Sequence, residues 1–296
     1  MELMADLFPS STTEQADEKT DHSSRICPIV YDIVDKEADV SLNPNYFDGF
    51  NWNYSPAFSY KNFDISSSMG PEHYAFDASY NFQEVVLFKG IVTHDRLTAS
   101  VIAPIMSKQL FMISLFDLRE ARLYDTLLGF DYVTPNNRAQ VHLWGTGLIR
   151  ATYIKRVTPR LYLAGRVSSS GGHFFWTREP QETSVGYAAR YETDKMVASA
   201  KAESSGDVLM TYVHKISKKV SLATDFVYNC FSRDVKASVG YDYNSRLSRV
   251  QGKIDSDGVV SAHLQRQLNE GLRCILSATL DLKNMAHRLG LRLTYG

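Results

Sequence analysis

The feature that most constrains this chain is an alternation of apolar and other residues that runs to its last residue. The final segment reads HRLGLRLTYG (287–296), with polar, charged or small residues at the even positions. The odd positions are His287, Leu289, Leu291, Leu293 and Tyr295. A period of two is typical of a β-strand whose two faces have different surroundings. Because chain ends fray unless another element holds them, we expect this strand to be paired.

The same alternation recurs through the second half of the chain. It is clearest in SVGYAARY (184–191), MVASAKAE (196–203), DVKASVGYDY (234–243) and RCILSATLDL (273–282). Short turn signals separate these segments, and Gly206, Gly258 and Gly271 provide the positive φ that tight hairpins need. A strand and a turn together take about 12 residues, which is the spacing of an up-and-down antiparallel meander.

The number of expected strands indicates a closed sheet. Counting from FNWNYSPAF (50–58) to the C-terminus gives about 19 strands, although strands two to eight are less regular and 123–134 admits another assignment. An open sheet of this size would leave two long unpaired edges, which closure removes. We therefore predict an all-β fold, a single barrel whose last strand pairs with the first near 47–54. An odd number of strands would make that pair parallel.

Composition is compatible with a barrel in a membrane. The chain has 44% hydrophobic residues, a mean hydropathy of −0.24 and no run long enough for a transmembrane helix. Aromatic residues gather near strand ends, as in interfacial girdles: Tyr187, Tyr191, Tyr212, Phe226, Tyr228, Tyr241, Tyr243 and Tyr295. Many polar-face positions are small: Ser184, Gly186, Ser199, Ser238, Gly240 and Ser277. Both patterns favour a membrane barrel with its apolar face outside; a soluble β-protein with that face inside is the alternative.

The N-terminal region differs from the rest. Residues 1–41 contain ten Asp or Glu and three Lys or Arg, a net charge of −7, so the remaining residues carry +6. We expect a disordered acidic tail at 1–27, a short helical segment at 28–46 and the barrel at 47–296. Within the helical segment Ile29, Ile33 and Val40 lie near helical spacing. The N-terminus has the features of neither a secretory signal nor a mitochondrial presequence, so we expect delivery from the cytosol without a cleaved address.

The sequence does not predict an enzyme. It contains no P-loop, HExxH, GxSxG or Rossmann glycine pattern. Cys27, Cys230 and Cys274 are widely spaced and have no metal-ligand pattern. No dense Lys/Arg stripe is present, so nucleic-acid binding is a poor interpretation. We therefore expect no catalytic residues, no metal and no cofactor.

Several blocks of the chain carry a resemblance to a known family. They include GYAARYETDKMVAS (186–199), KVSLATDFVYN (219–229), FSRDVKASVGYDY (231–243) and GKIDSDGVVSA (252–262). These blocks resemble the channel-forming subunit of the mitochondrial outer-membrane protein translocase, within the eukaryotic porin superfamily, and its plant forms in particular. The resemblance covers nearly the whole chain and is dense from about residue 148 onward.

The resemblance implies a fold and a function. The fold is a 19-stranded barrel with parallel first and last strands and an N-terminal helix inside the pore. The function is a protein-conducting, multi-pass channel of the mitochondrial outer membrane, through which unfolded precursors with presequences cross. The implied partners are receptors and small helical subunits of the translocase, membrane lipid and further copies of the barrel. The alternatives are a porin-like metabolite or anion channel of the same fold, and a soluble β-rich binding protein.

The last strand also resembles the mitochondrial β-signal, which the insertion machinery reads by strand addition. Arg288, Gly290, Leu293 and Tyr295 fit its positions; the alternative is that they are ordinary strand residues, with Gly290 packing closely. If Arg288 points inward, alternation assigns charged and polar residues to the pore wall. They are Lys201, Asp225, Lys236, Asp242, Arg249, Lys253, Asp255, His263, Arg273, Asp281, Arg288 and Arg292. This wall is mixed rather than strongly acidic, so a divergent paralogue with weakened import is a further alternative.

Overall fold

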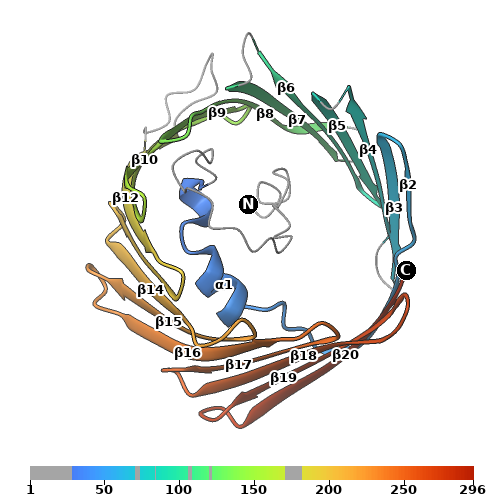
Figure 1. Cartoon of the computed structure of the whole chain (residues 1–296), viewed down its shortest axis with the longest axis vertical. Helices are drawn as coiled ribbons and strands as arrows, with labels where there is room; N and C mark the ends of the chain where they lie inside the picture. The colour runs from blue at the N-terminus through green and yellow to red at the C-terminus, as the bar shows by residue number, and fades with distance from the viewer. Residues whose placement is uncertain (1–28, 71–73, 84, 106–108, 120–121, 171–181) are drawn as a thin grey trace.

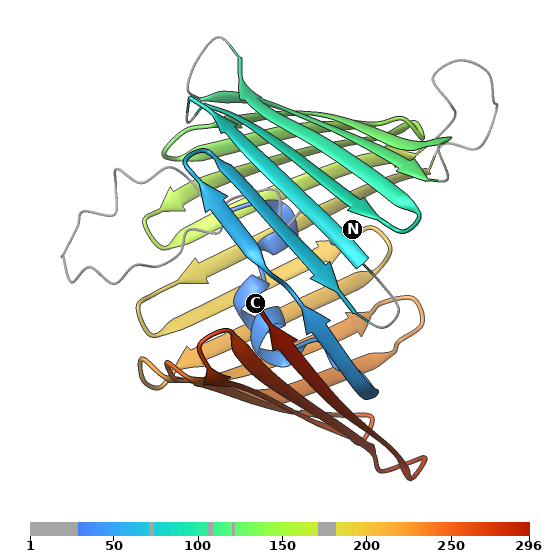
Figure 2. The same cartoon turned by 90° about the vertical axis from the view of Figure 1, so that its right-hand side faces the viewer.

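Twenty β segments make up most of the described chain, and they form one closed barrel (Figures 1 and 2). The computed structural model describes residues 29–70, 74–83, 85–105, 109–119, 122–170 and 182–296. The acidic tail expected at 1–27 lies outside these residues. The segments are β1 (Gly49–Tyr54), β2 (Ala57–Tyr60), β3 (Phe63–Met69), β4 (Tyr74–Phe82), β5 (Val86–Thr93), β6 (Arg96–Pro104), β7 (Leu110–Arg119), β8 (Arg122–Val133), β9 (Asn137–Trp144), β10 (Leu148–Thr158), β11 (Leu161–Ser170), β12 (Glu182–Glu192), β13 (Met196–Glu203), β14 (Asp207–Lys215), β15 (Val220–Asn229), β16 (Val235–Asn244), β17 (Ser248–Asp255), β18 (Val259–Asn269), β19 (Leu272–Asp281) and β20 (Ala286–Tyr295).

Consecutive segments from β2 to β20 pair antiparallel, and the ring closes through a parallel pair of β1 and β20. Its register runs from Gly49 opposite Gly290 to Tyr54 opposite Tyr295. The C-terminal strand is therefore held on both sides, by β19 and by β1. The expected meander and the parallel first and last pair are confirmed.

The first strand is interrupted at Pro56. The Ser55 N–H donates to the Tyr295 carbonyl (2.7 Å), and the Pro56 carbonyl accepts from the Ser67 N–H (3.0 Å). Proline has no N–H to donate, so it breaks the ladder locally while the chain continues in the same direction. Because both β1 and β2 pair with β3, they are two halves of one strand, and the described barrel has 19 strands, as predicted.

The turns agree with the residue types at the hairpins. Gly206, Gly258 and Gly271 have φ of 86°, 83° and 83°, in the left-handed region that favours glycine. The ambiguous segment at 123–134 is part of β8, whose pairing with β7 shifts register between Asp117 and Leu118. Such an irregularity disturbs the period of two, which explains why this region was hard to assign from the sequence.

Two short helical elements lie inside the ring of strands, η2 (Tyr31–Ile33) and α1 (Lys36–Leu42) (Figure 1). The expected helix in the pore is confirmed. Of the residues noted for their helical spacing, Ile29 is buried and Val40 is exposed. Tyr31, Val34, Ala38 and Leu42 are almost fully buried against the barrel wall. In the described part of the chain, no helix is both long and apolar enough to cross a membrane.

The polarity of the barrel is reversed relative to a soluble protein. Strand register assigns each residue to the lumen or to the outer face, because side chains alternate. Buried polar residues lie on the lumen face, for example Asp131, Gln140 and Gln251, each 2% exposed. Large apolar residues lie exposed on the outer face, among them Phe50 (63%) and Leu289 (65%). This arrangement is what a barrel in lipid requires, and it is the opposite of a soluble β-protein.

Candidate functional site

The lumen wall carries all twelve residues that alternation assigns to the pore. Strand register places each of them on the face of the sheet that also contacts η2 and α1. Six of the twelve contact residues 35–47 of the N-terminal segment: Lys201, Asp242, Arg249, Lys253, His263 and Arg292. The structure therefore brings these six together around one docked segment. Of the others, Asp225 accepts a hydrogen bond from Ser238, and Asp255 pairs with Lys253 at 3.1 Å.

Ion pairs hold the first part of the segment against β10–β13. Asp32 lies 3.5 Å from Arg150 and 3.4 Å from Arg166, and Asp35 lies 2.5 Å from Lys201. The two carboxylate oxygens of Glu37 accept from both terminal nitrogens of Arg190, a bidentate geometry that is among the strongest charge-assisted pairings. Arg190 also donates to the Val34 carbonyl and pairs with Glu192.

The second part of α1 is held by hydrogen bonds to β16 and β17. Gln251 donates to the Val40 carbonyl (2.6 Å), and Arg249 pairs with Asp242 (2.5 Å). Lys253 donates to the Asn43 side chain at 2.9 Å. Partners on β17 therefore orient the C-terminal end of α1, whose last carbonyl groups have no partner within the helix.

Small residues on the wall make room for this segment. A Cβ built on Gly186 would lie 2.4 Å from the Tyr31 hydroxyl, and one on Gly240 would lie 2.7 Å from Leu42 Cδ2. Contacts this short are excluded sterically unless a neighbour moves. At these two positions, the small polar-face residue provides the space that the docked segment occupies.

The chain crosses from the lumen into the wall beside Gly290. A Cβ on Gly290 would lie 2.4 Å from the Phe47 carbonyl oxygen and 2.6 Å from its ring. The Arg292 guanidinium lies over the Phe47 ring at 4.2 Å, and the Phe47 N–H donates to the Ser277 hydroxyl at 3.4 Å. Gly290 therefore packs closely, as the alternative interpretation proposed. The other positions of the expected β-signal divide between faces, with Arg288 in the lumen and Leu293 and Tyr295 outside.

The opposite wall has a different chemistry. The lumen face of β1–β4 carries hydroxyls and amides, with Asp64 and Asp77 and no Lys or Arg among its described positions. Lys89 on the neighbouring strand β5 lies 3.4 Å from Asp77. The lumen face of β5–β8 is mixed, and its apolar residues alternate with polar and charged ones such as Lys89, Arg96 and Asp117. The apolar residues on this face include Leu87, Ile91, Ile102, Phe111, Ile113, Leu115 and Leu127.

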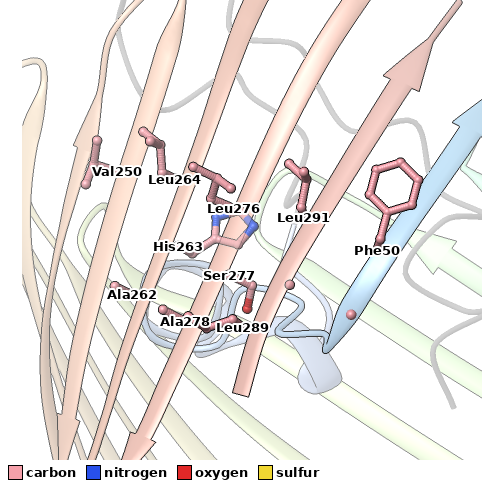
Figure 3. A pocket seen from close by; sticks show the side chains of 12 residues that line it. Phe50, Val250, Ala262, His263, Leu264, Leu276, Ser277, Ala278, Leu289 and Leu291 are labelled. Carbon is pink, nitrogen blue, oxygen red and sulfur yellow. The ribbon is translucent and has the colours of Figure 1, made fainter. Parts of the chain in front are cut away.

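Outside, an apolar recess of about 510 Å³ lies beside the seam (Figure 3). Adjacent strands contribute one row of side chains, and Ala262, Ala278 and Leu289 lie beside it. The row is Val250, Leu264, Leu276, Leu291 and Phe50, which are register neighbours from β17 to β1. His263 and Ser277 belong to the lumen face of the same strands.

The sequence analysis did not identify the arginines that form ion pairs with the N-terminal segment. Arg150, Arg166 and Arg190 occupy polar-face positions in alternating strands, so the period of two could have assigned them to the lumen. Their acidic partners could not be found this way, because the pairs join residues more than 100 positions apart. Among the described residues, no group of His, Cys, Asp and Glu could hold a metal ion.

The pH dependence of segment docking follows from Glu37. Burial alone raises the pKa of Glu37, but hydrogen bonds from Arg190 and its charge outweigh burial and hold the pKa below the ordinary 4.5; Lys215 on β14 lowers it further. A depressed pKa means that the ionised form stabilises docking at neutral pH, and that this is lost as the pH falls below 4.5 through the folded pKa. We expect a spin label at position 40, in a cysteine-free background, to become mobile on acidification.

The control for this titration is Glu37→Gln, which removes the titrating group. Its label should already be more mobile at neutral pH, and its remaining pH response should be smaller. Val40 suits the label because its side chain is exposed. Identical profiles for the two proteins would show that Glu37 does not hold the segment.

Comparisons with known proteins agree with this architecture. The family model described as eukaryotic porin matches residues 53–290. The chain is 39% identical to the probable mitochondrial import receptor subunit TOM40-2 of Arabidopsis thaliana, over 93% of this chain and 92% of that protein. It is 26% identical to the TOM40 homologue of Xenopus tropicalis, over 79% and 73% of the two chains. It is 28% identical to the human homologue, over 52% of this chain and 42% of that protein.

Proposed function

Because the chain belongs to the eukaryotic porin family, we propose that it is a protein-conducting channel that imports precursor proteins across the mitochondrial outer membrane. The barrel crosses this membrane many times, with its apolar face in lipid. The relatives are named mitochondrial import receptor subunits, which supports import over the coarser interpretation as a general porin. The proposal assigns no enzymatic activity and no cofactor to the chain.

The observation that carries the proposal is the division of the lumen wall. Mitochondrial presequences are amphipathic, rich in Arg and poor in acidic residues. The face of β1–β4 offers Asp64 and Asp77 among hydroxyls and amides, and the adjoining face of β5–β8 offers apolar side chains between polar and charged ones. An amphipathic basic segment can contact both at once. Several weak contacts suit a channel, because one tight site would stop transit.

The remaining residue assignments are part of the same proposal. The twelve lumen residues line the pore or, for six of them, hold the N-terminal segment within it. Arg288, Gly290, Leu293 and Tyr295 form the β-signal that the insertion machinery reads during assembly. The partners are unfolded precursors with presequences, receptor and small helical subunits, lipid and further copies of the barrel. The large outer apolar surface supports lipid and helical partners.

The test is single-channel conductance of the refolded protein in a planar bilayer, before and after addition of a basic presequence peptide. We expect cation preference and voltage-dependent, peptide-induced closures. Asp64→Asn combined with Asp77→Asn should reduce the closure frequency, because the peptide loses both carboxylates on its proposed path. Asp225→Asn combined with Asp255→Asn is the matched control, since it removes equal charge elsewhere on the wall.

Two outcomes would contradict the import function, and a third would contradict the proposed path along β1–β4. An anion-selective pore that ignores the peptide would favour the metabolite porin. Equal loss of closures in both double variants would show that β1–β4 is not the path. Carbonate extraction of the protein from membranes would restore the soluble alternative.

A further inference from the structure

Four basic side chains on neighbouring strands converge on the same part of the N-terminal segment. They are Arg150 on β10, Arg166 on β11, Arg190 on β12 and Lys201 on β13, here called the cationic patch. Their side chains are only 4–14% exposed, although they face the lumen. Arg166 and Lys201 also flank the Tyr31 ring, at 4.8 Å and 5.9 Å from its centroid.

The cationic patch is neutralised by the chain itself. Asp32, Asp35 and Glu37 reach all four cations. Two wall residues add to this, since Glu203 lies 2.6 Å from Arg166 and Glu192 lies 3.0 Å from Arg190. In these ion pairs four cations face five carboxylates, and three of those five belong to the segment. Without the three, four cations would face two carboxylates.

The three segment carboxylates behave as a bound ligand rather than as general surface charge. Asp32 bridges two arginines, and Glu37 makes a bidentate pair with a third. The carboxylate of Asp39, on the same helix, is exposed and accepts a hydrogen bond from the Asn43 side chain. Guanidinium groups arranged in this way recognise planar carboxylates and phosphates in general, whatever molecule carries them.

We propose that the cationic patch is a binding site for small multivalent anions bearing carboxylate or phosphate groups, and that Asp32, Asp35 and Glu37 occupy it as an internal ligand. Removing the internal carboxylates leaves nearly buried cations without full compensation, which is costly, so the segment lifts and the patch opens to the lumen. The inference does not rest on protein import, since it holds for any channel with this wall.

The experiment compares wild type with the triple variant Asp32→Asn, Asp35→Asn, Glu37→Gln in planar bilayers. The reversal potential in a salt gradient should shift toward anion preference in the triple variant. Added tripolyphosphate should block its current with an apparent Kd about tenfold or more below that of wild type, because the competing ligand is gone. Citrate serves as the carboxylate probe and should block in the same order. Asp39→Asn is the control, and it should behave as wild type.

Two further variants keep the test decisive. Adding Arg150→Gln and Arg166→Gln to the triple variant should abolish the extra block while the channel still conducts. Glu37→Gln alone should give a partial shift, and it serves if the triple variant does not insert. Unchanged selectivity and no gain in block in the variants would overturn the proposal. So would equal block in wild type, which would place the anions elsewhere on the wall, for example at Arg288 and Arg292.

Discussion

Replacement of Leu291 by arginine is expected to destabilise the folded barrel in lipid by about 2–4 kcal/mol, the cost of a cation near the bilayer midplane. Leu291 lies in the middle of β20, opposite Phe50 and Leu276 in register, and its side chain lines the outer apolar recess. An arginine here would have to leave lipid or draw water into it. No lumen-facing partner is accessible, because the side chain points away from the pore.

The measurement is the urea midpoint of the protein refolded into liposomes, followed by tryptophan fluorescence. Ser66→Arg is the matched control, because it adds the same side chain to the lumen face of β3, next to Asp77 in register. Its midpoint should change little. Similar losses in both variants would mean that the two faces have the same surroundings, which would contradict a barrel in lipid.

Gly290→Ala is expected to cost about 1–3 kcal/mol through overpacking at the seam. The added Cβ would lie 2.4 Å from the Phe47 carbonyl oxygen, and a backbone atom cannot move aside as a flexible side chain can. The chain turns from α1 into β1 at this point, so the clash acts on the pairing of β1 with β20. This effect is separate from any reading of Gly290 by insertion machinery.

Refolding into detergent or liposomes isolates the structural effect, because no insertion machinery is present. Seam closure can be followed by oxidative crosslinking of Phe50→Cys with Leu291→Cys, which face each other in register. Gly165→Ala is the control, since a Cβ there meets nothing within 4 Å. Wild-type stability and crosslinking in Gly290→Ala would mean that Phe47 shifts freely, leaving only the insertion signal to explain the glycine.

Most of the fold could be predicted from local sequence pattern. A period of two needs only neighbouring residues, so it predicted the strands of the second half and the hairpin glycines. Where β7 and β8 shift register, the period is disturbed and the assignment of 123–134 stayed open. The break at Pro56 was also hidden, because outward and inward residues keep alternating through it.

The arrangement of residues in the lumen could be predicted only in part. Alternation assigned Arg288 and Lys201 to the wall, but it could not tell an open wall position from one that holds a docked segment. That difference depends on α1, which has only seven residues and carries too weak a periodic signal to show which face packs. The helical spacing of Ile29, Ile33 and Val40 therefore did not show the buried face: Ile29 is buried, but Val40 is exposed, and Tyr31, Val34, Ala38 and Leu42 are the most deeply buried.

The sequence by itself determined the strands, their approximate number and the existence of two chemically different faces, because each follows from residues close together in the chain. Only the tertiary structure decided which wall holds the N-terminal segment. It paired Glu37 with Arg190 and seated Phe47 against Gly290, across 153 residues in the first case. Both contacts join residues far apart in the chain, because α1 lies inside the closed ring and Phe47 precedes the strand that pairs with β20. Local sequence pattern cannot predict these contacts, because they depend on charges and shapes that only the closed barrel brings together.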